Sequence, residues 1–173
     1  MTTIAFCTAL LCILAQITIP IPLVPITLQT LAVALVASIL TPKQSVLVVV
    51  TYLAMGAIGL PVFSNFTSGF GILFGPTGGF LWSFPLMAYM ISAGSHYFSY
   101  QKFAFISVHL SAMLLNLILG CIWLKYIINI SWSAALATGF TPFIIVGIVK
   151  VLIVVPLALA IRERLLKAKL LPY

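Results

Sequence analysis

The chain has 173 residues, of which 64% are hydrophobic and only 5% are charged, with a formal net charge of +7. A soluble domain carries about 25% charged residues, so this chain has too few of them to cover a surface that faces water. The composition excludes a water-soluble globular protein and indicates an all-α integral membrane protein in contact with lipid, with one membrane domain over residues 1–173. In such a protein basic residues act as orientation signals, so the positive charge indicates no nucleic-acid partner.

Six apolar segments are predicted to cross the membrane as helices. They lie near Thr3–Ile19, Thr27–Leu40, Gln44–Leu60, Gly79–Phe98, Phe103–Ile127 and Thr141–Ile161. A spanning helix needs about 20 residues, so the second segment is short and is expected to borrow from its flanks. The first segment lacks the basic region and cleavage site of a signal peptide, and we therefore expect it to be the first span.

The basic residues predict the orientation. Lys43 and Lys102 lie in the connections after the second and fourth segments, and a basic cluster follows the sixth: Arg162, Arg164, Lys167 and Lys169. With six spans these positions share one face, which the positive-inside rule makes cytoplasmic. Both termini are then expected in the cytoplasm of a multi-pass plasma-membrane protein, with the Pro- and Gly-rich connections outside.

The first outer connection, Pro20–Ile26, contains three prolines. Proline fixes φ and removes a backbone donor, so this segment is expected to be stiff and extended. It leads into Gln29. Two interpretations remain open: a rigid turn that ends in an exposed amide, or a segment that forms, with Gln29, one rim of an outward-facing ligand pocket.

The longest irregular stretch is Pro61–Phe80, PVFSNFTSGFGILFGPTGGF. Its five glycines and two prolines exclude a regular helix, yet its five phenylalanines make it too apolar for a solvated linker. Irregular backbone at membrane depth is tolerated only where it is buried in protein or lines a cavity. We therefore expect this stretch to cover or wall a binding pocket, with Asn65 among its polar side chains.

The same stretch ends in Gly75-Pro76-Thr77-Gly78-Gly79, directly before the fourth span. Thr77 is the expected N-cap, and free N–H groups at a helix start favour an anionic or carbonyl group of a ligand. Gly75, Thr77 and Gly78 are therefore candidate binding residues, although any tight turn before a helix has a similar sequence.

Polar and aromatic residues recur at helical spacing on the fourth and fifth spans. The fourth-span stripe contains Trp82, Pro85, Tyr89, Ser92 and His96, and the fifth-span stripe contains His109, Ala112, Asn116, Gly120 and Trp123. Helix packing explains many such stripes. Tyr89 and Asn116 are candidate binding residues, and Asn116 is the more informative, because a buried amide needs a hydrogen-bonding partner that the sequence does not identify.

Lys150 is the strongest single candidate. It lies about nine residues into the sixth span, roughly 13 Å below the outer surface at 1.5 Å per residue. A lysine there costs at least about 3 kcal/mol on insertion scales. No carboxylate can pair with it inside the bilayer, because the one acidic residue, Glu163, lies among the C-terminal basic residues. An anionic or carbonyl-bearing ligand from outside would supply the missing partner.

Other functions find little support in the sequence. One acidic residue and two separated histidines cannot ligate a catalytic metal, and there is no Walker A motif, so neither an enzyme nor a cofactor is expected. Cys7, Cys12 and Cys121 lie inside apolar runs without a metal or disulfide pattern. A purely structural membrane scaffold would leave the buried Lys150 unexplained.

Three blocks of the sequence, PLVPITLQTLAV, LTPKQSVLVVVTYLAMGAIGLPVFSNFTSGFGILFGPTGGF and PFIIVGIVK, resemble the BioY family. These proteins are the biotin-specific S components of energy-coupling factor (ECF) transporters. The resemblance covers most of the chain and implies a six-helix bundle with an outward-facing biotin pocket under its loops. It also implies that biotin is the transported ligand, and that a transmembrane coupling subunit and ATPase subunits are partners.

Several positions match positions of the family. Lys150 matches a family lysine implicated in binding biotin, and Gln29 and Gly75 fall on matching loop positions, as do Gly69, Gly79 and Pro76. Ala5 and Ala9 form an AxxxA pair that resembles the motif by which S components dock on the coupling subunit. Helix packing within the bundle is a competing explanation for that pair.

Gly147 departs from the family pattern PFLPGDxxK, because it stands where the family has an aspartate. Thr67 likewise stands where the family often has an arginine. Three consequences remain open: biotin is held by other contacts, with Asn116 or Asn65 as candidates, affinity is lower, or the ligand is a related vitamin-like anion. Solitary uptake without ATPase partners is a further alternative.

Overall fold

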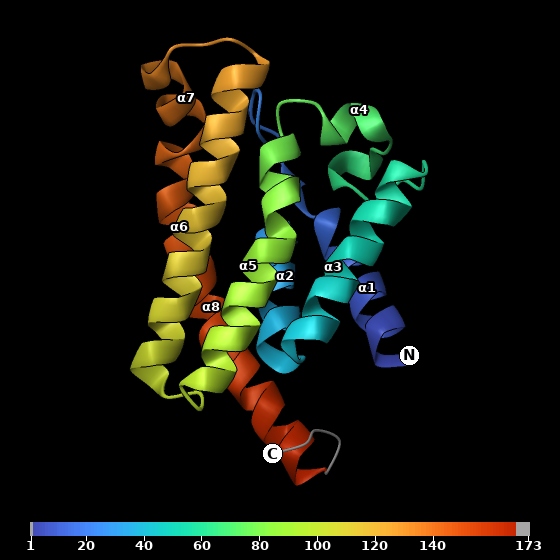
Figure 1. The fold of residues 1–173 in the computed structure, drawn as a ribbon, viewed down its shortest axis with the longest axis vertical. Helices are drawn as coiled ribbons and strands as arrows, with labels where there is room; N and C mark the ends of the chain where they lie inside the picture. Colours follow the sequence, from blue (N-terminus) through green and yellow to red (C-terminus); the bar gives the residue numbers. More distant parts are fainter. Residues whose placement is uncertain (1, 169–173) are drawn as a thin grey trace.

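A computed structural model describes residues 2–168 of the chain, so Lys169 of the basic cluster lies outside the described residues. The fold is helical apart from two short strands (Figure 1). Six longer helices form the body: α1 (Thr2–Ala15), α2 (Gln29–Ile39), α3 (Pro42–Ala57), α5 (Gly78–Tyr97), α6 (Lys102–Ile127) and α8 (Thr141–Lys167). Each segment that the sequence predicts as a span overlaps one of them, with ends that differ by up to six residues.

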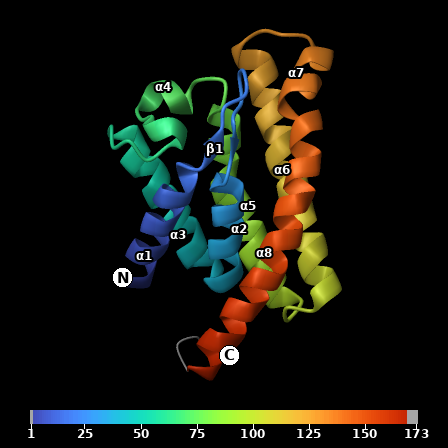
Figure 2. The same ribbon diagram turned by 180° about the vertical axis from the view of Figure 1, so that it is seen from behind.

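The helices alternate in direction, so that α1 begins and α8 ends at the same end of the molecule (Figures 1 and 2). We call this the base of the molecule and the opposite end the top. The base holds two short turns, α2–α3 and α5–α6. Thr41 starts α3 through a capping box with Gln44, whose Oε1 accepts from the Thr41 backbone N–H at 3.3 Å.

The top of the molecule carries the irregular backbone and five small elements that the sequence did not predict. Strands β1 (Thr18–Ile19) and β2 (Ile26–Thr27) pair antiparallel, so the proline-rich segment is the loop of a hairpin. We call residues 58–77, between α3 and α5, the second connection; it holds a 3₁₀ turn, η1 (Ser64–Phe66), and the short helix α4 (Phe70–Leu73). Residues 128–140, between α6 and α8, hold α7 (Trp132–Gly139). Because α1 ends at Ala15, the first predicted span is four residues too long, and its last residues belong to the hairpin.

The longer helices differ in length and hydropathy, and therefore in whether they could cross a membrane. Among the described residues, two helical stretches are long and apolar enough to cross a membrane by those criteria alone: Lys102–Ile127 and Trp132–Lys167. The shortest of the six longer helices is α2, as its segment length predicted. It packs against α1, α3, α5 and α8, and most of its side chains are buried.

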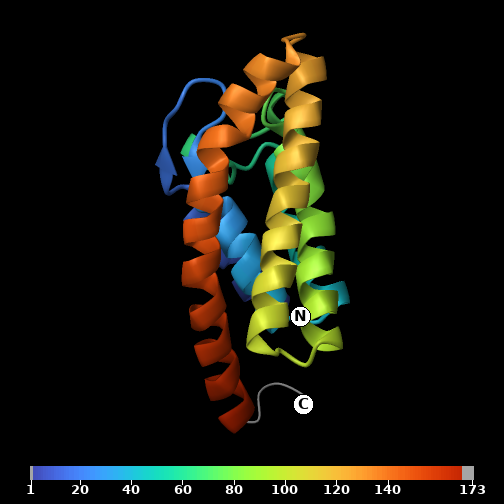
Figure 3. The ribbon, with the colours of Figure 1, turned by 90° about the vertical axis from the view of Figure 1, so that its left-hand side faces the viewer.

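Glycines bring α5 and α6 close together, and this is the most extensive helix pair in the fold (Figure 3). A Cβ at Gly79 would lie 2.1 Å from Trp123 Cβ, and one at Gly120 would lie 2.2 Å from the ring of Phe80. Real Cβ atoms do not approach so closely, so each glycine leaves room for an aromatic side chain of the facing helix. This contact also fixes the ring of Phe80, which lines the cavity described next.

Candidate functional site

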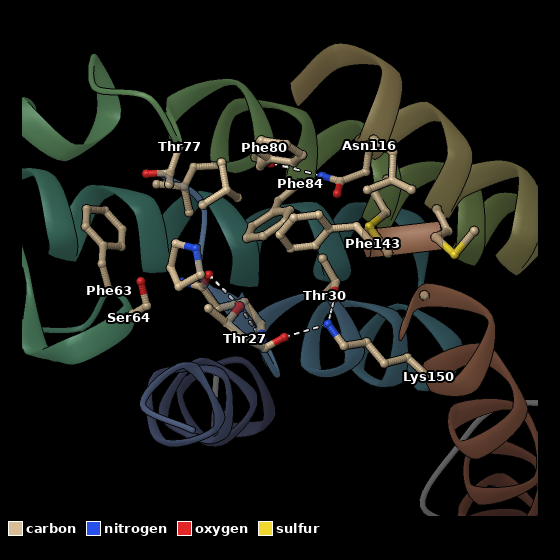
Figure 4. Close-up of a pocket in the computed structure, with 18 of the residues that line it drawn as sticks. Thr27, Thr30, Phe63, Ser64, Thr77, Phe80, Phe84, Asn116, Phe143 and Lys150 are labelled. Atoms are coloured by element: carbon tan, nitrogen blue, oxygen red, sulfur yellow. Dashed lines mark hydrogen bonds between the residues drawn. The ribbon is translucent and has the colours of Figure 1, made fainter. Parts of the chain in front are cut away.

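A cavity of about 70 Å³ lies near the top of the molecule, between the hairpin, the second connection and helices α2, α5, α6 and α8 (Figure 4). Its walls are largely apolar, with four phenylalanines among them: Phe63, Phe80, Phe84 and Phe143. Phe80 of α5 and Phe143 of α8 contact each other with ring centroids 6.2 Å apart. Five of the sequence-predicted binding residues line this cavity: Gln29, Thr77, Asn116, Gly147 and Lys150.

Lys150 brings a cation from α8 to the wall of the cavity. Its Nζ donates to the backbone carbonyl of Thr27 at 2.6 Å and to Thr30 Oγ1 at 2.9 Å. An ammonium has three N–H donors, so one donor is left for a group inside the cavity. In the described part of the chain, the side chain is therefore held by two neutral oxygens and by no carboxylate.

Asn116 of α6 is 2% exposed and presents the complementary chemistry. Its Nδ2 donates to the Phe80 carbonyl at 3.0 Å and to Ser83 Oγ at 2.6 Å. Because a carbonyl can only accept, the atom beside Phe80 must be the amide nitrogen, which settles the orientation of the side chain. Both N–H groups are thus used within the protein, and Oδ1 is the atom that can accept a hydrogen bond from a ligand.

Gln29 lies at the start of α2 and is 6% exposed. Its Nε2 donates to the hydroxyl of Tyr52 at 2.6 Å, and its Oε1 accepts from Thr27 Oγ1 at 3.0 Å. The interpretation of Gln29 as an exposed amide at the end of a turn is therefore wrong. The side chain ties α2 to α3 and to β2, and it lines the cavity while holding Thr27 in place.

At the start of α5, backbone N–H groups that the sequence predicts to be free make hydrogen bonds within the protein. Thr77 occupies the N-cap position and lines the cavity, but its side chain makes no capping hydrogen bond. The N–H of Gly78 donates to the Gly75 carbonyl at 3.0 Å and that of Phe80 to the Thr77 carbonyl at 3.2 Å. Because both N–H groups already donate within the protein, the prediction that free N–H groups at the start of α5 bind an anion is wrong for Gly78 and Phe80.

Gly75 and Gly78 do not line the cavity. The carbonyl of Gly75 accepts from Trp123 Nε1 at 3.0 Å, and a Cβ at Gly78 would lie 2.0 Å from the Leu73 carbonyl oxygen. Both glycines are needed because the backbone packs closely there. Their place in the fold is to seat the second connection on α6, away from the lining of the cavity.

Tyr89 and Asn65 also lie away from the cavity. Tyr89 is 53% exposed, since the inner face of α5 is formed by Phe84, Met87 and Ile91 instead. Asn65 is exposed at the top, where its Oδ1 accepts from Thr18 Oγ1 at 2.6 Å. Asn65 thus connects the second connection to the hairpin and is not a contact of the cavity.

Gly147 lines the cavity three residues before Lys150, on the same face of α8. A Cβ there would lie 2.2 Å from Met113 Sδ, so the side chain of Met113 fills the space beside the glycine. Met113 is one of several cavity residues that sequence reasoning missed, together with Thr27, Thr30, Met87 and Phe143. Thr27 contributes a backbone carbonyl, which no side-chain pattern reveals, while Thr30 could have been found as the polar residue next to Gln29 at the start of α2.

Ala5 and Ala9 lie on α1, outside the cavity, and both are exposed. The same helix exposes large apolar side chains, including Phe6 and Ile13. This face is accessible to lipid or to another protein, and its assignment as a docking face remains a prediction.

A largely apolar cavity with a few fixed polar groups, in a helical protein with stretches apolar enough to cross a membrane, is typical of the class of membrane proteins that bind a small molecule. The chain matches the BioY family over residues 1–167. It is 44% identical over 165 residues to biotin transporter BioY2 of Lactococcus lactis subsp. cremoris, covering 95% of this chain and 91% of that protein. It is 35% identical over 157 residues to biotin transporter BioY of Thermotoga maritima, covering 90% and 91%.

A solved structure has the same fold. The S-component for biotin from an ECF-type ABC transporter superposes with a TM-score of 0.77 at 30% identity, covering 90% of this chain and 88% of that one. The chain therefore belongs to the BioY family, and it is a membrane transport protein rather than an enzyme.

Proposed function

We propose that this protein takes up biotin, by capturing it in the cavity beneath the hairpin and the second connection and delivering it through an ECF transport complex. The observation that carries this proposal is the pairing, in one apolar cavity, of a free Lys150 donor with a free Asn116 acceptor. Relatives named as biotin transporters favour biotin over another vitamin-like anion.

The chemistry of biotin fits these groups. Its ureido ring has two N–H donors and one carbonyl, its other end is a carboxylate, and the remainder is apolar. Lys150 can donate to either the carbonyl or the carboxylate, and Asn116 Oδ1 can accept from a ureido N–H. Phe84 and Phe143 lie between these two residues in Figure 4 and would bury the apolar part of the ligand.

Asn116 would also compensate for the missing aspartate. Gly147 has no side chain to accept a hydrogen bond, and the space beside it holds Met113. A neutral amide oxygen accepts more weakly than a carboxylate, because charge-assisted hydrogen bonds are about twice as strong. The proposed site therefore binds biotin through a neutral acceptor and one cation.

We place the top of the molecule outside the cell and the base in the cytoplasm of a protein that crosses the plasma membrane six times as one domain. Lys43 and Lys102 lie at the base, at the starts of α3 and α6, with the basic residues that end α8. The positive-inside rule then makes the base cytoplasmic. Energy coupling would come from ATPase subunits and a transmembrane subunit, with Ala5 and Ala9 of α1 as its docking face.

The test is biotin binding to the purified protein in nanodiscs, measured by isothermal titration calorimetry beside two lysine variants. Lys150→Ala should weaken binding at least tenfold, because the ligand loses a charge-assisted hydrogen bond in a dry site, worth about 1.5–3 kcal/mol or more. Lys125→Ala is the matched control, since Lys125 contacts the rings of Tyr126 and Trp132 and does not line the cavity. Binding that survives in Lys150→Ala would contradict the proposed site.

A further inference from the structure

A second, smaller cavity of about 20 Å³ adjoins the candidate site on the side of the base. Its deeper walls include Ala34, His109 and Val154. A space of this size holds about one water-sized group. The shape of the ligand space in this protein therefore depends on what separates the two cavities.

Five residues line both cavities and form the partition between them: Thr30, Met87, Met113, Gly147 and Lys150. Three of them are fixed. Thr30 and Lys150 are hydrogen-bonded to each other, and Gly147 has no side chain. The other two residues of the partition, Met87 and Met113, have flexible side chains whose length a substitution can change.

Met113 is the methionine that stands against α8. The atoms nearest to a Cβ built on Gly147 are all its own: Sδ at 2.2 Å, Cγ at 3.1 Å and Cε at 3.4 Å. Its thioether thus occupies the space that any side chain at position 147 would need, one helical turn from Lys150. Met113 is 7% exposed, so this position is an enclosed contact and not a surface one.

We propose that Met113 is a specificity-determining residue, which closes the ligand cavity toward the base and so limits the length of the ligand that fits. This inference rests on the proposed function, because it names a determinant of the same site. Shortening Met113 joins the two cavities beside Lys150 and admits a longer ligand. Adding a side chain at Gly147 displaces the thioether and takes room from the ligand, since Gly147 lines both cavities.

The first test measures ligand length directly. The dissociation constants of three ligands are compared in nanodiscs: biotin, its homologue with one more methylene in the acid chain, and biotin methylated on a ureido nitrogen. In Met113→Ala, the affinity for one of the two enlarged ligands should rise at least tenfold relative to the affinity for biotin. The identity of that ligand shows which end of biotin lies at Lys150. Leu117→Ala is the matched control, because Leu117 lies one turn along α6 and lines only the upper cavity.

The second test changes the other partner of the Met113–Gly147 contact, which is Gly147 on α8. Gly147→Ala should weaken biotin binding at least tenfold, and the double variant with Met113→Ala should return to within threefold of Met113→Ala alone. Adding Leu117→Ala to Gly147→Ala should give no such recovery. Met113→Leu, which keeps the volume of the side chain but shortens it, replaces the alanine variant in both tests if that variant does not fold.

The outcomes separate the inference from the proposed function. A parent protein that binds no biotin would overturn both. A parent that binds biotin, with unchanged relative affinities in the Met113 variants and no recovery in the double variant, would overturn the role of Met113 alone. A relative gain of an enlarged ligand together with recovery in the double variant would establish it.

Discussion

At the scale of single residues, the site depends on polar groups whose partners come from distant parts of the chain. Lys150 is held by a backbone carbonyl of β2 and a hydroxyl of α2, so the cost of placing an ammonium in the membrane is offset by hydrogen bonds of about 1.5–3 kcal/mol each. The sequence indicates that Lys150 needs a partner. The sequence cannot show that the Thr27 carbonyl and Thr30 Oγ1 accept two of its hydrogen bonds, because a backbone carbonyl leaves no signal in a side-chain pattern.

Asn116 permits a test at the same scale. Asn116→Ala should weaken biotin binding at least tenfold, because it removes the free acceptor Oδ1 from the cavity. Part of any loss could come from the helix contact, since the amide also binds Phe80 and Ser83 of α5. Calorimetry of both Asn116→Ala and Ser83→Ala separates these effects.

Ser83→Ala is the control because Ser83 bonds to the amide but does not line the cavity. It should lower the temperature of unfolding while leaving biotin affinity within threefold. Equal losses of affinity in both variants would mean that Asn116 serves only to join α5 and α6.

The limits of the sequence at this scale are clear from the residues that it misplaced. Tyr89 and Asn116 are both polar positions within stripes of helical spacing, yet Tyr89 faces outward and Asn116 inward. In lipid the outer face of a helix is itself apolar or aromatic, so spacing alone does not tell which face of α5 packs inward. Gly75 and Gly78 were misplaced because glycine accompanies close packing and ligand contact alike.

At the scale of elements, the six longer helices follow from apolar runs, whereas the small elements at the top depend on tertiary contacts. Gln16, just after α1, shows how these contacts are made. Its Nε2 donates to the Val62 carbonyl at 3.1 Å, and its Oε1 accepts from the Phe66 N–H at 2.8 Å. Together with the Thr18–Asn65 hydrogen bond, these contacts hold the second connection against α1 and the hairpin.

This arrangement predicts that Gln16 controls the rate at which ligand leaves. Gln16→Leu should speed biotin dissociation about 30-fold, because it removes two hydrogen bonds of about 1 kcal/mol each from the segment that covers the cavity. The rate is measured by displacing radiolabelled biotin from protein in nanodiscs. The association rate of biotin should change little, because the substitution leaves the residues that line the cavity in place.

Gln44→Leu provides the comparison for that experiment. It also removes a glutamine hydrogen bond, but from the capping box at the base, away from the cavity. It should cost about 1 kcal/mol of stability without changing the dissociation rate. A faster release in Gln44→Leu would assign the effect to general loosening of the bundle.

At the scale of the whole molecule, the two ends differ. The base has short turns and most of the basic residues, and the top has the hairpin, α4, α7, the cavity and Lys125 at the end of α6 (Figure 1). The proposed orientation places every element that can admit biotin on the outer side. Labelling with a membrane-impermeant maleimide in intact cells tests it.

For that experiment Cys7, Cys12 and Cys121 are first replaced by alanine, which leaves no other thiol in the chain. A cysteine at Phe66, which is 70% exposed at the top, should react in intact cells. A cysteine at Tyr97, which is 82% exposed at the base, should react only after the cells are permeabilised. The reverse pattern would invert the proposed topology.

The hydrogen bond from Lys150 to Thr27 joins residues 123 positions apart, one from the first hairpin and one from the last helix. During biosynthesis the hairpin is therefore made long before the residue that completes the cavity. A nascent chain that has not yet inserted α8 has neither the lysine nor the wall formed by Phe143, so under the proposed function we expect it not to hold the ligand. Ligand that binds only the finished bundle favours it over partly inserted forms by mass action, so biotin in the medium should raise the yield of correctly assembled protein.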